Sequence, residues 1–113
     1  MTGPALPTDG DEQLFVLVAR FDAAAPPGAV ELLAAQPTCR RLRYVRATDV
    51  ADSWTLIAEF AGAAAYRAAL SPFDVRTTVI PWLSTAIAGS GVGEALLSAD
   101  TGVVTSHRPT VEH

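Results

Sequence analysis

The residue types that build metal, nucleophilic or phosphate sites are scarce in this chain. Its two histidines, His107 and His113, lie near the C-terminal end, and its only cysteine is Cys39. A metal site needs several such ligands at short spacing, and a nucleophile needs a base beside it. The glycine run 89–93 lacks the GK[ST] ending of a phosphate loop and leads into an expected strand. We therefore expect no metal site, no catalytic triad and no nucleotide loop, and we interpret Cys39 as a small buried residue.

Size and composition indicate one globular domain. The chain has 113 residues, of which 50% are hydrophobic and 18% charged, so it is too apolar to be disordered. The net charge of −4 argues against nucleic acid as the main partner. No stretch approaches the roughly 18 apolar residues that span a bilayer, and no signal peptide is visible. We expect a cytoplasmic protein that does not enter a membrane.

The first half of the chain predicts three strands and one helix. Residues 1–12 form a breaker-rich, flexible lead-in, and residues 13–21 form a strand that is apolar on both faces. A helix over about 26–36 follows, with Pro26 and Pro27 in its first turn. Residues 39–47 and 54–60 predict two further strands, joined by the polar loop 48–53. In 54–60, alternate positions place Leu56 and Phe60 on one face and Glu59 on the other.

The second half predicts two helices and a final strand. An Ala-rich helix covers about 61–70, and Ser71 then caps a new helix with Pro72 at its first position and Asp74 completing a capping box. That helix runs to about residue 87 with a kink at Pro81. Residues 92–98 predict a weaker fourth strand. The remaining residues 99–113 lack periodicity, and we expect them to form a mobile C-terminal tail.

This order, β-α-β-β-α-α-β, is typical of a ferredoxin-like α+β sandwich with all helices on one face of the sheet. The domain spans residues 13–98. Because the strand 13–21 is apolar on both faces, its second face needs a cover. We expect a homodimer in which two sheets pair face to face, since two-fold dimers are the commonest such solution.

The run from Trp54 to Trp82 adds a resemblance to a known family. A strand starting at Trp54, the helix with Tyr66-Arg67, and the cap Ser71-Pro72-Phe73-Asp74-Val75 follow one another without a break. Together with the preceding elements they resemble the antibiotic biosynthesis monooxygenases, small dimeric α+β barrels, over residues 13–98. The resemblance implies two activities: cofactor-free oxidation of phenolic or quinol-type aromatics by O2, or haem degradation.

The haem-degrading pattern is missing from this chain. Such relatives are marked by an Asn on the first strand and a His on the last long helix, but 13–21 contains no Asn and 72–87 contains no His. Without an axial ligand, haem has no specific anchor. The resemblance therefore implies a protein that uses no cofactor and binds a small aromatic molecule.

The resemblance also suggests roles for particular side chains. Trp54 would form an aromatic wall, Tyr66 would hydrogen-bond a phenolate, Arg20 would stabilise its charge, and Glu59 would act as the base. The expected catalytic residues are thus Trp54, Tyr66, Arg20 and Glu59, and the expected substrate-binding residues are Phe73, Arg67, Arg76 and Trp82.

Each of these residues also has a purely structural interpretation. Trp54 can be a core anchor, Tyr66 a packing residue, Arg20 an ion-pair partner of Asp22, and Glu59 a solvent-facing side chain. The resemblance favours a cofactor-independent monooxygenase of a polycyclic aromatic phenol or quinol. The alternative is a non-catalytic small-molecule-binding or structural homodimer. A structural dimer would pack four aromatic side chains of its helices and strands against each other and leave no cavity between them. These side chains are Trp54, Tyr66, Phe73 and Trp82.

Overall fold

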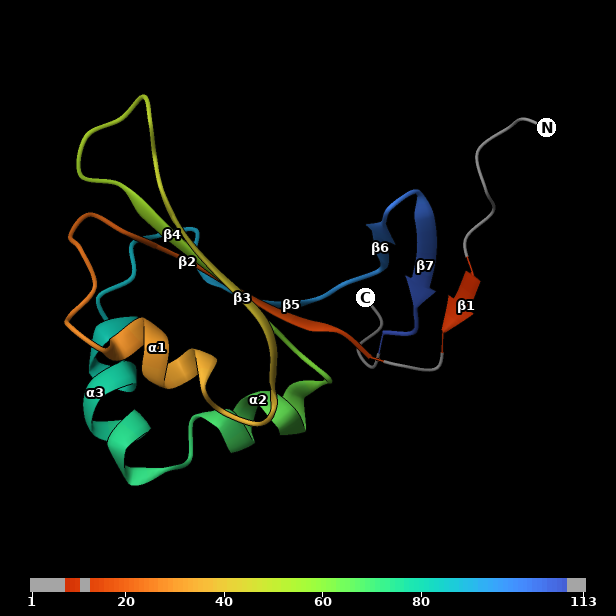
Figure 1. Cartoon of the computed structure of the whole chain (residues 1–113), viewed down its shortest axis with the longest axis horizontal. Coiled ribbons are helices and arrows are strands. Elements are labelled where there is room, and N and C mark those ends of the chain that lie inside the picture. Colours follow the sequence, from red (N-terminus) through yellow and green to blue (C-terminus); the bar gives the residue numbers. More distant parts are fainter. Residues whose placement is uncertain (1–7, 11–12, 110–113) are drawn as a thin grey trace.

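The computed structural model describes residues 8–10, by their backbone, and residues 13–109. It contains a four-stranded antiparallel sheet in the order β3-β4-β2-β5, and a smaller three-stranded sheet in the order β1-β7-β6 (Figure 1). The strands of the main sheet are β2 (Phe15–Phe21), β3 (Cys39–Arg46), β4 (Trp54–Phe60) and β5 (Gly91–Glu94). The smaller sheet consists of β1 (Thr8–Gly10), β6 (Leu97–Asp100) and β7 (Val103–His107).

Three helices cover one face of the main sheet: α1 (Ala29–Ala34), α2 (Ala63–Ala69) and α3 (Phe73–Leu83) (Figure 1). The order β2-α1-β3-β4-α2-α3-β5 confirms the predicted ferredoxin-like α+β fold. None of the described helices is long and apolar enough to cross a membrane.

The hydrophobic core lies between the main sheet and the helices. Alternate residues of the two central strands point into it, and their register places Ala19 opposite Leu56 and Leu17 opposite Ala58. The predicted division of β4 is confirmed, because Leu56 and Phe60 are fully buried whereas Glu59 lies on the other side. The helices contribute the buried residues Ala29, Leu33, Ala69, Val75, Val79 and Trp82.

The opposite side of the main sheet is called the open face here, because the described helices all lie on the core side. The pairing registers define its residues. Glu59 has Val16 and Arg41 as neighbours, and Ile57 has Val18 and Arg43. Thr55 lies between Arg20 and Val45 in the next row. An extra residue at Arg40 forms a bulge at the start of β3 and shifts the register there.

Two predicted helix starts are wrong. Gly28 precedes α1 in a left-handed conformation, with φ of 81°, so Pro26 and Pro27 lie outside the helix. Before α3, the Ser71 hydroxyl donates a hydrogen bond to the carbonyl of Ala68 at 2.9 Å, so it closes the preceding helix and does not cap the next one. Pro72 occupies the cap position, and α3 ends earlier than predicted, at Leu83.

The C-terminal segment differs from the expected tail. The predicted strand 92–98 is divided between β5 and β6. The N–H of Ala95 still bonds to the carbonyl of Leu14 at 2.8 Å, and the chain leaves the main sheet after this bond. Strands β6 and β7 then form a hairpin whose two loop residues, Thr101 and Gly102, both have positive φ. We call this hairpin, residues 97–107, the arm. It projects beyond the main sheet (Figure 1).

Strand β1 falls within the expected N-terminal lead-in and pairs in parallel with β7. The other residues of that lead-in, 1–7 and 11–12, lie outside the described residues, as does His113.

Candidate functional site

The space between sheet and helices is filled by side chains. Phe60 and Leu56 from β4 are fully buried, as are Val75 and Val79 from α3. The Trp82 ring stacks on Phe21 with centroids 4.7 Å apart. This packing leaves the grooves on the surface as the candidate sites, three of which involve predicted residues.

The first groove has a volume of about 530 Å³ and runs between the β2–α1 connection and α3. Trp82 provides an aromatic wall and Asp22 a carboxylate, and three threonines of α3 and its C-terminal turn add hydroxyl groups. The lining residues are Asp22, Ala23, Ala24, Pro26, Thr77, Thr78, Pro81, Trp82 and Thr85. The groove therefore combines apolar walls with a few polar groups, as small-molecule sites generally do.

Trp82 has an unusual feature beside this groove. Its side chain is only 4% exposed, and its Nε1 atom is buried without a hydrogen-bond partner. The ring is fixed by its stack on Phe21 and by an edge contact with Tyr44 at 6.0 Å, and the Tyr44 hydroxyl in turn accepts a hydrogen bond from the N–H of Ala25 at 2.9 Å. An unpaired buried N–H is unfavourable, and an acceptor on a ligand would satisfy this donor once the groove wall moves enough to expose it.

Tyr66 lies on the same side of the sheet but in a different place. Its ring contacts Phe15 and Phe60, with centroid distances of 5.3 and 5.2 Å. Burial raises the pKa of its hydroxyl above the usual 10.0. The hydroxyl therefore stays protonated at neutral pH and can donate a hydrogen bond.

Glu59 and Arg20 lie on the open face, so the sheet separates them from Tyr66 and Trp82. The backbone of Arg20 is held in place: its N–H donates to Ser90 Oγ at 2.8 Å, and its carbonyl accepts from Ile87 at 2.8 Å. The structure shows no ion pair between Arg20 and Asp22, although both residues are described. The predicted catalytic residues are thus divided between the two faces of the sheet.

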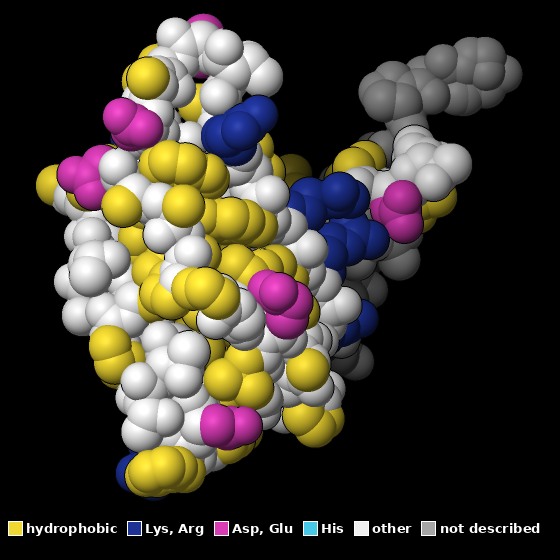
Figure 2. Space-filling model, turned by 60° about the vertical axis from the view of Figure 1, so that its left-hand side comes forward, with side chains coloured by type: hydrophobic (Ala, Val, Ile, Leu, Met, Phe, Trp, Pro, Cys, Tyr) yellow, Lys and Arg dark blue, Asp and Glu magenta, His cyan; other side chains and the backbone are white. Residues whose placement is uncertain are grey.

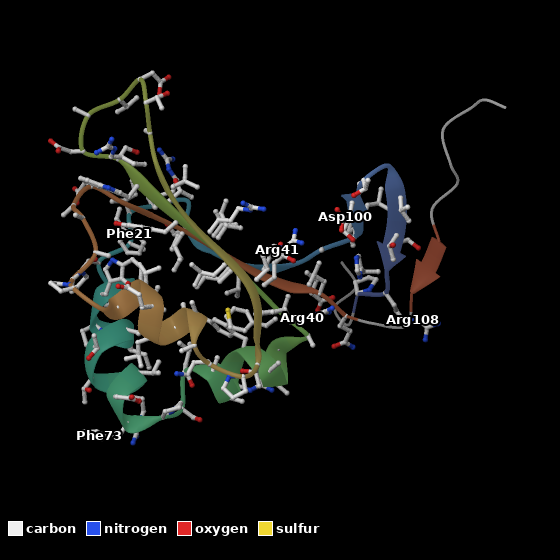
Figure 3. All side chains as sticks on the ribbon, viewed as in Figure 1. Phe21, Arg40, Arg41, Phe73, Asp100 and Arg108 are labelled. Carbon is white, nitrogen blue, oxygen red and sulfur yellow. The ribbon has the colours of Figure 1, made fainter. Side chains whose placement is uncertain are left out.

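The remaining predicted residues are scattered. Trp54 is half-buried at the start of β4 and lines a groove of about 770 Å³ together with the β3–β4 loop. Phe73 is 73% exposed at the start of α3 (Figure 3), and Arg67 and Arg76 are exposed on α2 and α3. Trp54, Tyr66, Phe73 and Trp82 therefore do not form the single packed cluster expected of a purely structural dimer.

The third groove, of about 680 Å³, lies between the open face and the arm, and the sequence interpretation missed it. Ser98 Oγ and His107 Nε2 form a hydrogen bond of 2.6 Å within it. Arg40 and Arg41 line the groove from the main sheet, and Asp100 lines it from the arm (Figure 3). The Thr101-Gly102 loop, followed by Val103, Val104 and Thr105, was the available hairpin signal.

Cys39 and the metal-binding residue types add no further site. Cys39 is half-buried, and burial, as the largest cause, raises the pKa of its thiol, which disfavours the reactive thiolate. Across residues 13–109, no group of three or more His, Cys, Asp or Glu side chains could hold a metal ion.

Comparisons with known proteins identify the fold. A scan against models of protein families and a search of curated proteins found no match. Among solved structures, the chain is similar to SnoaB, a cofactor-independent oxygenase from Streptomyces nogalater, with a TM-score of 0.53 and 23% identity over 81% of this chain and 98% of that one. The N63A mutant of SnoaB matches with a TM-score of 0.51 and 24% identity, over 75% of this chain and 91% of that one.

A protein from Chloroflexus aurantiacus J-10-fl, proposed to be an antibiotic biosynthesis monooxygenase, matches with a TM-score of 0.52 and 15% identity. This alignment covers 80% of our chain and 98% of that protein. At these identities the likeness concerns the backbone arrangement and leaves the substrate open. The chain thus has the α+β fold of SnoaB and of the antibiotic biosynthesis monooxygenases, over most of its length.

Proposed function

We propose that this chain is a cofactor-independent oxygenase that oxidises an aromatic phenol or quinol, polycyclic in size, with O2. The observation that carries the proposal is the groove beside Trp82, where an aromatic wall, the Asp22 carboxylate and a buried, unpartnered indole N–H occur together. The fold shared with SnoaB, described as a cofactor-independent oxygenase, supports the same reaction class.

The proposed reaction assigns one task to each of these groups. Asp22 accepts the proton of the substrate hydroxyl or of its acidic carbon, and the indole N–H of Trp82 donates a hydrogen bond to the resulting oxyanion. The electron-rich anion transfers an electron to O2, and the two radicals combine to a peroxide. Loss of water from the peroxide leaves one oxygen atom in the oxidised product and the other in water, so no external reductant is needed.

The predicted site residues take different places in this proposal. Trp82 is the aromatic wall, a role expected of Trp54. Asp22 takes the part of the base in place of Glu59, because Glu59 lies across the sheet from Trp82. Phe73, Arg67 and Arg76 lie along α2 and α3, and in this proposal they have no contact with the reacting atoms.

The proposed working unit is a homodimer that pairs the open faces of two main sheets. Val18 and Val45 are exposed on this face, and Val16 and Ile57 are half-buried there. Exposed apolar side chains on one sheet face are stabilised when a second sheet covers them. We also propose the cytoplasm as the compartment, since a single cysteine provides no internal disulfide that would favour an oxidising one.

A second candidate function is a non-catalytic dimer that binds a small molecule or only assembles. The observation that favours it is the filled interior, in which Leu56 and Phe60 are fully buried between sheet and helices. A substrate could not enter that space without displacing them. The groove beside Trp82 would then bind an aromatic molecule without turning it over.

The test is oxygen uptake by the purified, metal-free protein with a panel of anthrones and reduced naphthoquinones. We expect uptake above the spontaneous rate with a single oxidised product, and a loss of uptake in Trp82→Phe. Trp54→Phe is the matched control, because Trp54 lines a different groove. Uptake lost only in Trp54→Phe would move the site to the β3–β4 loop, and the absence of uptake by the wild type would support the non-catalytic dimer.

A further inference from the structure

The hydrogen bond between Ser98 and His107 places a hydroxyl group beside a base. The Oγ and Nε2 atoms are 2.6 Å apart, which is within the reach of a nucleophile and its base. When Nδ1 carries the ring proton, Nε2 accepts the hydroxyl proton of Ser98. A serine whose hydroxyl donates to a neutral imidazole is activated as a nucleophile, because the imidazole takes its proton during attack.

Strand pairing holds both residues in position. The sequence interpretation placed His107 in a mobile tail, where nothing would hold it beside a nucleophile. The structure instead places it at the end of β7, and its backbone N–H donates to the carbonyl of Leu96 at 2.8 Å. Ser98 lies on β6 opposite Thr105 of β7. His107 and Thr105 are alternate residues of β7, so both share a face of the arm with Ser98.

This face of the arm lines the third groove. Alternate residues of β7 line it, from Val103 to His107, whereas Ser106 between them does not. Ser98 also lines it, and both members of the pair are half-buried. A molecule bound in the groove can therefore contact the Ser98 hydroxyl.

The wall opposite the arm comes from the main sheet and combines apolar and charged side chains. The buried Leu14 and the half-buried Val16 form its apolar part. Glu59 and Arg41 are cross-strand neighbours on β4 and β3, and both line the groove. Figure 2 shows basic side chains gathered beside the arm. A guanidinium in the groove can stabilise negative charge that develops on a bound carbonyl oxygen.

The size and lining of the groove favour a small ester as its ligand. Its volume of about 680 Å³ lies in the range of small-molecule sites. Its apolar side chains can hold an acyl chain while the ester carbonyl lies at the Ser98 hydroxyl. Ester hydrolysis needs a nucleophile, a base and a group that stabilises the oxyanion. The groove brings these three together in Ser98, His107 and Arg41.

We propose that Ser98 and His107 are the nucleophile and the base of a second activity, the hydrolysis of a small carboxylic ester bound in the third groove. Ser98 Oγ attacks the ester carbonyl while His107 Nε2 takes its proton, and Arg41 stabilises the tetrahedral oxyanion. The bond from carbon to the alcohol oxygen then breaks, and His107 returns the proton to that oxygen. Water activated by His107 releases the acid from Ser98, so ester and water become acid and alcohol.

This activity is separate from the proposed oxygenation. Trp82 and its groove lie on the helix side of the main sheet, whereas Ser98 and His107 lie in the groove between the open face and the arm. Hydrolysis needs no oxidant, and all of its groups come from one chain. Neither oxygen uptake nor dimer formation therefore decides it.

The first experiment measures hydrolysis of p-nitrophenyl acetate by the purified full-length chain. We expect turnover above the spontaneous rate, and Ser98→Ala and His107→Gln should each lower kcat/KM by about 100-fold or more. Ser106→Ala and His113→Gln are the matched controls. Ser106 lies on the same arm but does not line the groove, and His113 is the other histidine of the chain. Both controls should keep the wild-type rate.

A second measurement uses only the wild-type chain and therefore does not depend on the folding of a variant. A fluorophosphonate ester transfers its phosphonyl group to an activated serine and releases fluoride. Tandem mass spectrometry of proteolytic peptides should find this group on Ser98 before it appears on other serines such as Ser84 and Ser106. Labelling at equal rates on all serines would overturn the proposal.

The outcomes separate this inference from the proposed oxygenation. The proposal is wrong if the wild type does not hydrolyse the ester above the spontaneous rate, or if Ser98→Ala keeps that rate. An equal loss in His107→Gln and His113→Gln would also overturn it, because imidazoles would then cleave the ester without the serine. Hydrolysis that depends on Ser98, in a protein that takes up no oxygen, would support this site and refute only the oxygenase.

Discussion

Replacing Trp82 by phenylalanine tests the buried indole N–H directly. Phenylalanine keeps a ring that can stack on Phe21 but removes the Nε1 donor, which has no partner among the described residues. Truncating a buried Trp to Ala costs about 3–5 kcal/mol, and a ring of intermediate size should lose less than half of that, about 2 kcal/mol. Removing an unpaired buried N–H restores about 1–3 kcal/mol. The two contributions nearly cancel, so we expect Trp82→Phe to change the free energy of unfolding by less than about 1 kcal/mol.

Urea denaturation followed by far-UV circular dichroism measures this difference without relying on tryptophan fluorescence. Trp82→Ala serves as the comparison, and it should lose about 3–5 kcal/mol because it also removes the stack on Phe21. If Trp82→Phe lost as much as Trp82→Ala, the indole N–H would have a partner in solution, and the reasoning about an available donor would be refuted.

The same variant has a separate functional consequence. If the indole N–H donates to the oxyanion of the substrate, its removal should lower kcat/KM for oxygen uptake by about tenfold, which corresponds to about 1.4 kcal/mol. A variant with wild-type stability and wild-type kcat/KM would show that the N–H does not contact the substrate.

Three further predictions concern the fold around the site. Phe60→Ala should lower the free energy of unfolding by about 3–5 kcal/mol in urea denaturation, because Phe60 is fully buried. Gly62→Ala should lower it by about 1–3 kcal/mol, because φ of 124° is unfavourable for any residue with a Cβ; Gly28→Ala, whose φ of 81° lies nearer the left-handed helical region, should lose less. Burial raises the pKa of Tyr66, so the unfolded chain loses this proton first and stability falls as pH rises above about 10. Tyr66→Phe should reduce that alkaline loss in urea denaturation across this pH range, whereas an unchanged pH profile would contradict it.

The fold could be predicted because its signals are local. The β4 segment alternates strictly, so the sequence places Leu56 and Phe60 on one face and Glu59 on the other, and the first two are buried in the structure. The two helices after β4 were likewise expected from the Ala-rich run and the Ser71-Pro72 break, and α2 and α3 lie there. Errors occurred at helix ends, where one backbone torsion such as that of Gly28 decides whether the preceding prolines belong to the helix.

The candidate site could be predicted only in part, because it depends on which residues from distant segments meet. Trp82 was expected to bind substrate, but its neighbour Asp22 comes from a loop about sixty residues away and carries no sequence signal of its own. The arm was missed for a different reason. Its hairpin loop uses Thr101-Gly102, which is a weaker turn signal than Asn-Gly.

The filled interior places a limit on how this chain can work. A groove bounded on one side by Trp82 offers a substrate less protection from water than an enclosed cavity, and oxygenation through a carbanion or phenolate needs that protection. The loop 22–26 that borders the groove is tied to the core through the bond from Ala25 to the Tyr44 hydroxyl, and Tyr44 contacts Trp82. A substrate that displaced this loop would therefore also disturb the indole it needs. Catalysis at Trp82 thus requires a small movement that exposes Nε1 while the ring stays stacked on Phe21. Simple binding in the groove does not require that movement, and this difference separates the two candidate functions.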